Sequence, residues 1–274
     1  MNRLLLTKNH LSSQVYTKLS YELTYSNQIA IITLNSPTDL NVLSTPMRSE
    51  LSTLLSTLDR DPQIKVIVLQ SQVPKAFCAG ANIKEFTPLS SESYSRDDIF
   101  EPFSTILTNL KKPMVAAVNG VAAGGGFELV LNCDIILASE DAKFAFPEIK
   151  LGLIPGIGGT QRFTKIVGRS IASRYVLTGE FFNAQQAKTW GVVSEVYKVE
   201  DLKKEALEVA KKVADMSMYT AIAAKDAVKQ ANELGISEGL KFERRVFQGL
   251  INTKAVKEGV DAFLKKRKAN FNNI

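Results

Sequence analysis

The pattern of hydrophobic and polar positions predicts alternating strands and helices in the first two thirds of the chain. Polar and apolar residues alternate over 21–25, a Ser-Asn turn follows, and 29–34 is almost continuously apolar, which predicts a β-hairpin. Ser44 followed by Pro46 predicts a helix that runs to about Asp59. Further elements are expected as strands at 66–70, 114–118 and 134–138, helices at 99–110 and from Gly124, a small-residue loop at 77–82, and a polar mobile loop at 88–98.

The pattern changes after about residue 180 and becomes helical. A short helix is expected at 184–190, and hydrophobic residues then recur with helical periodicity in four segments, at 201–214, 217–233, 236–250 and 254–268. The sequence therefore predicts an α/β core followed by an all-helical part. We place the core at 21–195 and the helical region at 196–274, after an N-terminal segment at 1–20.

Composition limits the class of protein without identifying a function. The chain has 274 residues, 45% of them hydrophobic, which is enough for one large domain or two small ones. No apolar run reaches the ~18–20 residues that a membrane-spanning helix needs. The formal net charge is +6, which indicates either a generally basic surface or a polyanionic partner such as nucleic acid, an anionic membrane or a phosphate-bearing small molecule. Zinc-finger spacing and RNA-binding aromatic signatures are absent from the sequence, so nucleic acid is the less favoured partner.

The N-terminal segment is basic and lacks acids. Residues 1–20 contain Arg3, Lys8, His10 and Lys18, and the first acid is Glu22. Such a composition is typical of a mitochondrial targeting segment, and a disordered basic tail is the alternative.

The inventory of catalytic residue types is short. The one histidine, His10, lies in the N-terminal segment, which argues against Ser-His-Asp or Cys-His chemistry on the folded body. The two cysteines, Cys78 and Cys133, are too few for a zinc cluster or a disulfide framework, and we expect no metal site and reduced thiols. Cys78 lies in the small-residue loop, where packing is a better interpretation than a nucleophile because no histidine is available to activate it.

Two glutamates, Glu128 and Glu148, lie on glycine-rich segments and suggest a proton-transfer chemistry. Gly124-Gly125-Gly126 lets the backbone approach a ligand closely, and a helix that starts there favours negative charge. A carboxylate beside such a site could exchange protons with a substrate whose oxygen becomes negative. Taken singly, Glu128 could be a helix N-terminal acid that complements the dipole, and Glu148 an exposed loop acid.

The glycines do not form a nucleotide-binding motif. A dinucleotide fingerprint requires a third glycine where this chain has Leu129, the later glycine segment has Gln161 at the corresponding position, and a Walker lysine is missing. The glycines therefore more readily shape an oxyanion site than hold a pyrophosphate.

Together, these segments resemble the enoyl-CoA hydratase/isomerase (crotonase) superfamily. The resemblance covers about residues 21–271 and is carried, in order, by the segments 76–85, 112–120, 124–134, 146–162 and 266–271. It implies a ββα spiral core with a helical C-terminal trimerisation region, usually assembled as a dimer of trimers. It also implies an acyl-CoA thioester substrate, whose coenzyme A is part of the substrate, and no further cofactor. The last segment is similar to the tail of short-chain mitochondrial members, which implies the mitochondrial matrix.

The resemblance implies a role for individual residues. It places the oxyanion hole on the backbone N–H groups of Ala81 and Gly125, and the catalytic pair on Glu128 and Glu148, with Glu128 as the base toward water and Glu148 as the acid toward C2. Further substrate contacts are expected from Ala79, Asn82, Ile83, Lys84, Gly156 and Lys266, with Lys75 as another candidate for the coenzyme A phosphates. For the three lysines, ordinary solvated surface positions are the alternative.

Both glutamates together point to a hydratase, because family isomerases typically lack the first. The expected reaction adds water to trans-2-enoyl-CoA and gives 3-hydroxyacyl-CoA in fatty-acid β-oxidation. The alternatives are an isomerase or a methylglutaconyl-type hydratase on the same fold, and an RNA-binding or structural protein.

Three residues depart from the family pattern. Ser36 stands where Arg is frequent, Asn82 where Asp is common, and Phe127 where a small residue or Cys is usual. The bulk of Phe127 is expected to narrow or reshape the acyl pocket.

Overall fold

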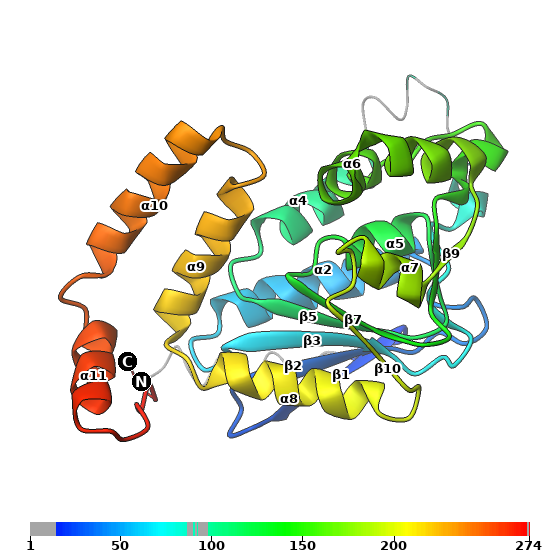
Figure 1. The fold of residues 1–274 in the computed structure, drawn as a ribbon. Coiled ribbons are helices and arrows are strands. Elements are labelled where there is room, and N and C mark those ends of the chain that lie inside the picture. Colours follow the sequence, from blue (N-terminus) through cyan, green and yellow to red (C-terminus); the bar gives the residue numbers. More distant parts are fainter. Residues whose placement is uncertain (1–14, 87–89, 91, 93–97, 273) are drawn as a thin grey trace.

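The computed structural model describes residues 15–86, 90, 92, 98–272 and 274 (Figure 1). Its centre is a six-stranded sheet in the order β1-β2-β3-β5-β7-β10. The strands are β1 (Leu19–Thr24), β2 (Ile29–Leu34), β3 (Val66–Ser71), β5 (Met114–Val118), β7 (Ile135–Ser139) and β10 (Glu195–Tyr197). β1 and β2 form an antiparallel hairpin, and every other neighbouring pair is parallel. The predicted hairpin and the three predicted strands are confirmed.

A second, four-stranded sheet lies beside the first. Its order is β4-β6-β8-β9, made by β4 (Ala76–Cys78), β6 (Val121–Ala123), β8 (Lys143–Ala145) and β9 (Phe182–Asn183). β4, β6 and β8 pair in parallel, and each follows shortly after a strand of the large sheet. The chain thus adds one strand to each sheet in every turn of the spiral. Segment 77–82 was predicted as a loop, but its first two residues belong to β4.

The large sheet is buried on both faces. Alternate residues of β2, β3, β5 and β7 point to opposite cores, which explains why these strands are apolar at almost every position. One face packs beneath α2 (Thr45–Arg60), α4 (Glu101–Asn109) and α5 (Gly125–Val130). The other is covered by α8 (Leu202–Ala214) through Leu202 and three alanines spaced by four residues. α8 therefore packs with the core, although it lies in the region that the sequence assigned to the C-terminal helices.

The helices near the centre differ most from the prediction. α7 (Ala184–Thr189) agrees with the short helix expected at 184–190 and connects β9 of the second sheet to β10 of the large sheet. The short 3₁₀ helices η1 (Ile83–Glu85), after β4, and η2 (Pro147–Leu151), after β8, were not predicted. The longest helix, α6 (Gly159–Thr178), was not predicted. It contains Gly168 in a non-helical conformation with φ 78°, so its hydrophobic periodicity is interrupted.

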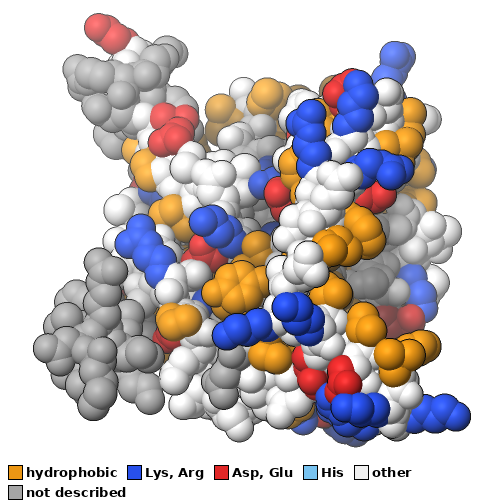
Figure 2. Space-filling model, turned by 90° about the vertical axis from the view of Figure 1, so that its left-hand side faces the viewer, with side chains coloured by type: hydrophobic (Ala, Val, Ile, Leu, Met, Phe, Trp, Pro, Cys, Tyr) orange, Lys and Arg blue, Asp and Glu red, His pale blue; other side chains and the backbone are white. Residues whose placement is uncertain are grey.

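The last three helices form an arm that extends away from the sheets (Figure 1). They are α9 (Met218–Gln230), α10 (Ile236–Leu250) and α11 (Lys254–Leu264), which confirms the predicted helices, although the last ends at 264 and not at 268. None of the described residues of α9 or α10 is buried. Figure 2, which faces the arm, shows hydrophobic patches among lysines and arginines. Large hydrophobic residues of the arm that are more than half exposed are Tyr219, Val228, Ile236, Leu240, Phe247, Val260, Phe263 and Leu264.

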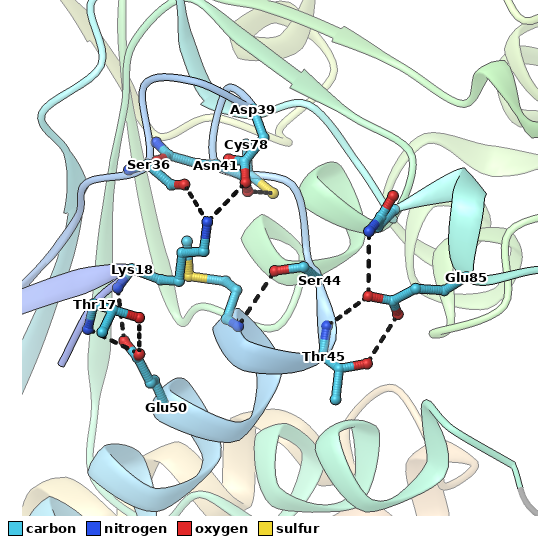
Figure 3. Close-up of polar contacts among 12 residues, drawn as sticks. Thr17, Lys18, Ser36, Asp39, Asn41, Ser44, Thr45, Glu50, Cys78 and Glu85 are labelled. Carbon is cyan, nitrogen blue, oxygen red and sulfur yellow. Dashed lines mark hydrogen bonds and ion pairs between the residues drawn. The ribbon is translucent and has the colours of Figure 1, made fainter.

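The ordered fold begins before residue 21. Leu19 already belongs to β1, and Glu50 of α2 accepts hydrogen bonds of 2.9 Å from the backbone amides of Thr17 and Lys18 (Figure 3). Residues 1–14 of the predicted targeting segment, and most of the predicted mobile loop at 88–98, lie outside the described residues. No helix in the described part of the chain is long and apolar enough to cross a membrane.

Candidate active site

A cavity of about 410 Å³ lies where the second sheet meets the N-terminus of α5. Its walls come from the segment after β4, the start of α5, η2 and the loop that leads to α6. The cavity brings together most of the predicted site residues, namely Ala79, Ala81, Ile83, Gly125, Glu128, Glu148 and Gly156.

Glu128 lies in the first turn of α5 and is only 2% exposed. Its Oε1 accepts hydrogen bonds from the backbone amides of Ile157 and Gly159, each 2.7 Å long. Burial raises the pKa of this carboxyl group, and the two amides act in the opposite direction by stabilising the carboxylate. The loop before α6 thus fixes one oxygen of Glu128 and leaves Oε2 for another partner. Sequence reasoning missed these two amides, although the glycine-punctuated loop that carries them was recognised.

Glu148 lies in η2 and is partly buried. Burial, with a smaller contribution from the negative charge of Glu128, raises the pKa of Glu148 to about 7. Its Oε2 is buried and has no hydrogen-bond partner among the described residues. Buried polar atoms are almost always paired, so an unpartnered carboxylate oxygen beside a cavity indicates a ligand or water that binds there. A carboxyl group that titrates near neutral pH is suited to proton transfer.

The backbones of Ala81 and Gly125 lie close together at the cavity. A Cβ added to Gly125 would be 3.7 Å from the amide nitrogen of Ala81. Gly125 is the first residue of α5, where an N–H group has no partner within the helix. No backbone carbonyl of the described residues accepts the amide of Ala81. Two donors of this kind can stabilise an oxygen that becomes negative.

The close packing of α5 against β4 requires the glycine at position 126. A Cβ there would lie 2.2 Å from the carbonyl oxygen of Cys78, so no other residue type fits without a shift of the backbone. The triplet that stood out in the sequence therefore serves two purposes, since Gly125 faces the cavity and Gly126 faces the second sheet.

The rest of the cavity wall is apolar, and sequence reasoning missed it. Phe86 and Phe100 stack with ring centroids 5.8 Å apart, and Leu151, Leu153 and Ile154 line the same cavity. The last three are exposed at 53%, 42% and 68%. Exposed apolar side chains that gather at a cavity are typical of a site for a hydrophobic ligand. Their only signal in the sequence was a run of apolar residues in a glycine- and proline-rich loop.

The remaining predicted substrate contacts do not line this cavity. Asn82 caps η1 by accepting a hydrogen bond from the amide of Lys84. Lys84 is exposed next to the cavity residue Ile83, and Lys75 is exposed immediately before β4. Lys266 is exposed after the end of α11, on the arm.

Phe127 does not line the cavity, contrary to the expectation from its bulk. It is fully buried, and its ring contacts those of Phe144, Phe146, Phe163 and Phe182 at centroid distances of 4.9–5.7 Å. The side chain points from α5 into the core behind the site, because the cavity face of this helix is taken by Gly125 and Glu128.

Ser36, which also departs from the family pattern, and the packed Cys78 are both part of buried polar contacts. Ser36 is 4% exposed, and its hydroxyl accepts a hydrogen bond of 3.0 Å from the amine of Lys18, which also pairs with Asp39 (Figure 3). Cys78 is fully buried, and its thiol donates to the carbonyl of Asn41. Burial raises the pKa of this thiol to about 12, as expected for a packed cysteine and not for a nucleophile.

Comparisons with known proteins agree with this geometry. The model of the enoyl-CoA hydratase/isomerase family matches residues 24–273. A mitochondrial enoyl-CoA hydratase of Pongo abelii is 46% identical over 246 residues, which cover 90% of this chain and 84% of that protein. A probable enoyl-CoA hydratase of Rhizobium meliloti is 46% identical over 244 residues, covering 89% and 94%.

Among solved structures, an enoyl-CoA hydratase subunit I of Geobacillus kaustophilus superposes with a TM-score of 0.90 at 38% identity. It covers 94% of this chain, and the match spans 99% of that protein. The predicted ββα spiral is therefore confirmed as the crotonase fold. The chain is an enzyme that belongs to the enoyl-CoA hydratase/isomerase family.

Proposed function

We propose that the enzyme adds water to trans-2-enoyl-CoA thioesters and releases 3-hydroxyacyl-CoA. The observation that carries the proposal is the meeting of two glutamates from separate elements, Glu128 and Glu148, in one cavity with the backbones of Ala81 and Gly125. An isomerase moves a proton within its substrate and needs one carboxylate, whereas hydration must also activate a water. Two carboxylates in different surroundings are suited to share those tasks.

The reaction begins with the thioester carbonyl in the oxyanion site. The N–H groups of Ala81 and Gly125 donate to its oxygen and draw electron density from the conjugated double bond, which makes C3 electrophilic. A single fixed donor of this kind is typically worth ~3–4 kcal/mol in the transition state. Apolar wall residues such as Phe86 and Leu153 accommodate the acyl chain and exclude bulk water.

Proton transfer completes the addition. Oε2 of Glu128 takes a proton from a water as its oxygen bonds to C3, and protonated Glu148 gives its proton to C2. Atoms and charge balance, since one water is consumed and the enolate-like charge is discharged at C2. A proton then passes from Glu128 to Glu148 through solvent, which restores both groups. Because the two carboxylates interact, their titrations belong to the pair.

The coenzyme A part of the substrate and the contacts between subunits involve residues outside the cavity. Lys84 and Lys75 bind the coenzyme A phosphates, and Lys266 of a neighbouring subunit adds a third contact. The apolar faces of the arm join subunits into a trimer or a dimer of trimers, which analytical ultracentrifugation can test. No cofactor is needed, because the two carboxylates and two amides suffice for the chemistry.

We also place the enzyme in fatty-acid β-oxidation in the mitochondrial matrix. The acid-free basic segment at 1–20 and the mitochondrial relative support this location. The segment fused to a fluorescent protein should direct it to mitochondria.

The decisive experiment follows the ultraviolet absorbance of crotonyl-CoA. Wild type should consume it, and Glu128→Gln and Glu148→Gln should each lower kcat by about a hundredfold or more while binding of the CoA ester persists. Glu238→Gln, in an exposed ion pair with Lys241 on the arm, is the matched control and should retain activity. Full activity in either site variant would contradict the mechanism. Turnover of a 3-enoyl-CoA in place of crotonyl-CoA would point to an isomerase.

A further inference from the structure

Glu85 connects the segment that carries the Ala81 amide, residues 80–85, to the N-terminus of α2. We call residues 80–85 the oxyanion segment. Glu85 ends η1, four residues after Ala81, and its Oε1 accepts a hydrogen bond of 2.8 Å from the amide of Thr45 (Figure 3). Its Oε2 accepts a second bond of 3.1 Å from the hydroxyl of Thr45. A carboxylate at the first residue of a helix also benefits from the helix dipole. One side chain thus fixes the downstream end of the oxyanion segment.

Arg48 fixes the same segment from its other side. It is 5% exposed, and its guanidinium lies 3.0 Å from Oε2 of Glu85 and also donates to the carbonyl of Leu43. Leu43 forms an isolated parallel bridge with Ala81, and its amide donates to the carbonyl of Gly80 over 2.7 Å. The Glu85–Arg48 pair therefore connects, through one buried guanidinium, to the residues on both sides of the Ala81 amide.

The pair reaches the cavity wall as well. The guanidinium carbon of Arg48 lies 4.6 Å from the ring centroid of Phe100, within the range of a cation–π contact. Phe100 stacks on Phe86, and both rings line the cavity. Arg48 is thus the common support of the oxyanion segment and of the aromatic wall.

The asparagine at position 82 suits this arrangement. Its Nδ2 donates to Oε1 of Glu85 over 3.3 Å, where an aspartate would place a second negative charge. Burial would raise the pKa of Glu85, but hydrogen bonds from the Thr45 amide and from Arg48 outweigh it and lower the pKa. Glu85 is therefore ionised at neutral pH.

We propose that Glu85 and Arg48 are positioning residues that hold the Ala81 amide in line with the thioester oxygen. The inference rests on the proposed function, because it names the residues that hold one of the two oxyanion donors in place. A donor stabilises the transition state only if it is fixed before the reaction, and small displacements of the segment weaken it. Loss of the pair should therefore affect kcat more than KM.

The test is Glu85→Gln, which keeps the size of the side chain and removes its charge. We expect kcat with crotonyl-CoA to fall about tenfold, part of the effect of losing a whole oxyanion donor, with KM changed by less than about twofold. The carbonyl stretch of bound butyryl-CoA, a saturated thioester that is not hydrated, reports the hydrogen bond directly. Its shift to lower frequency should be smaller in Glu85→Gln than in wild type. Glu238→Gln again serves as the control, and neither readout should change in it.

The outcomes separate this inference from the proposed function. If wild type neither hydrates crotonyl-CoA nor shifts the carbonyl band, the oxyanion assignment itself fails. If wild type does both and Glu85→Gln matches it in kcat and band position, the positioning role is overturned, even if the variant melts at a lower temperature. If Glu85→Gln does not fold, Glu85→Asp, which retracts the carboxylate by one methylene, takes its place with the same criteria.

Discussion

The carboxylate of Glu148 lies directly beside Gly124, in space that a side chain at position 124 would occupy. A Cβ at Gly124 would lie 2.8 Å from Oε1 of Glu148, and Gly124 has a φ of 51°, a conformation that side-chain-bearing residues rarely adopt. A side chain at position 124 would therefore displace the Glu148 carboxylate from its place beside the start of α5. The glycine triplet not only exposes the amide of Gly125 but also sets where Glu148 lies.

Gly124→Ala should consequently displace Glu148 and lower kcat by at least about tenfold, because misplacement of a catalytic group by even ~1 Å can be worth more than that. Gly191→Ala is the matched control. Gly191 has a φ of 80°, and no described atom lies within 4 Å of a Cβ placed there. Both variants should lose about 1–2 kcal/mol of stability from the backbone conformation, but only Gly124→Ala should lose turnover. Equal kcat values in the two variants would mean that Glu148 tolerates the displacement.

The pH dependence of turnover follows from the pKa of Glu148, which burial raises to about 7. As the acid toward C2, Glu148 must be protonated before the reaction. We expect kcat/KM for crotonyl-CoA to decline as the pH rises through this pKa, and to decline also in acid, where the base Glu128, whose pKa burial raises, becomes protonated. The residual rate of Glu148→Gln should lack this inflection. A rate that instead rises through neutral pH would reverse the roles of Glu148 and Glu128.

Phe127 should affect stability and not the choice of acyl chain, since its ring lies in the aromatic core behind the site. Phe127→Ala should lower the free energy of unfolding by about 3–5 kcal/mol, as measured by urea denaturation. Phe181→Ala, which truncates a side chain that is 51% exposed and lies outside the arm, is the control and should change little. Phe127→Leu should keep the wild-type ranking of short-chain and medium-chain enoyl-CoA substrates. A reversed ranking would show that the ring shapes the pocket after all.

Lys112 should stabilise the C-terminal end of α2. Its side chain is 2% exposed and donates to the carbonyls of Leu58 and Asp61, and burial lowers its pKa to about 8. Lys112→Met should leave these carbonyls unpaired and lower the free energy of unfolding by about 1–3 kcal/mol. Lys111→Met, at the exposed neighbouring position, should leave the urea midpoint unchanged. Equal midpoints for both variants would mean that water replaces the amine without loss.

The sequence predicted those elements whose signals are local. Ser44 caps α2 with extended dihedral angles, and its side chain accepts from Met47 as a capping residue does. Four strands of the large sheet, β2, β3, β5 and β7, were visible because burial on both faces produces nearly continuous apolar runs. β1 was recognised from its alternating pattern and the turn after it, whereas β10 has only three residues and was not predicted. The strands of the second sheet have only two or three residues each, too few for a period, and Gly168 conceals the length of α6.

For the site, the sequence suggested a chemical pair but not its surroundings. Glu128 and Glu148 were notable because of the glycines beside them, and the roles of individual residues came from the family resemblance. The partners of Glu128, the stacked rings of Phe86 and Phe100, and the contacts of Arg48 depend on segments that meet only in the folded chain. Contacts between segments that are far apart in the sequence cannot be predicted from a local sequence pattern.

Subunit contact through the arm, as proposed above, would make the stability of this enzyme depend on its concentration. Since none of the described residues of α9 and α10 is buried, these helices should open in a lone chain without disturbing the sheets. Their amides would then exchange with deuterium long before those of β3 or β5. Any neighbour that covers the arm turns this local opening into a step that requires dissociation, so dilution alone would accelerate the exchange.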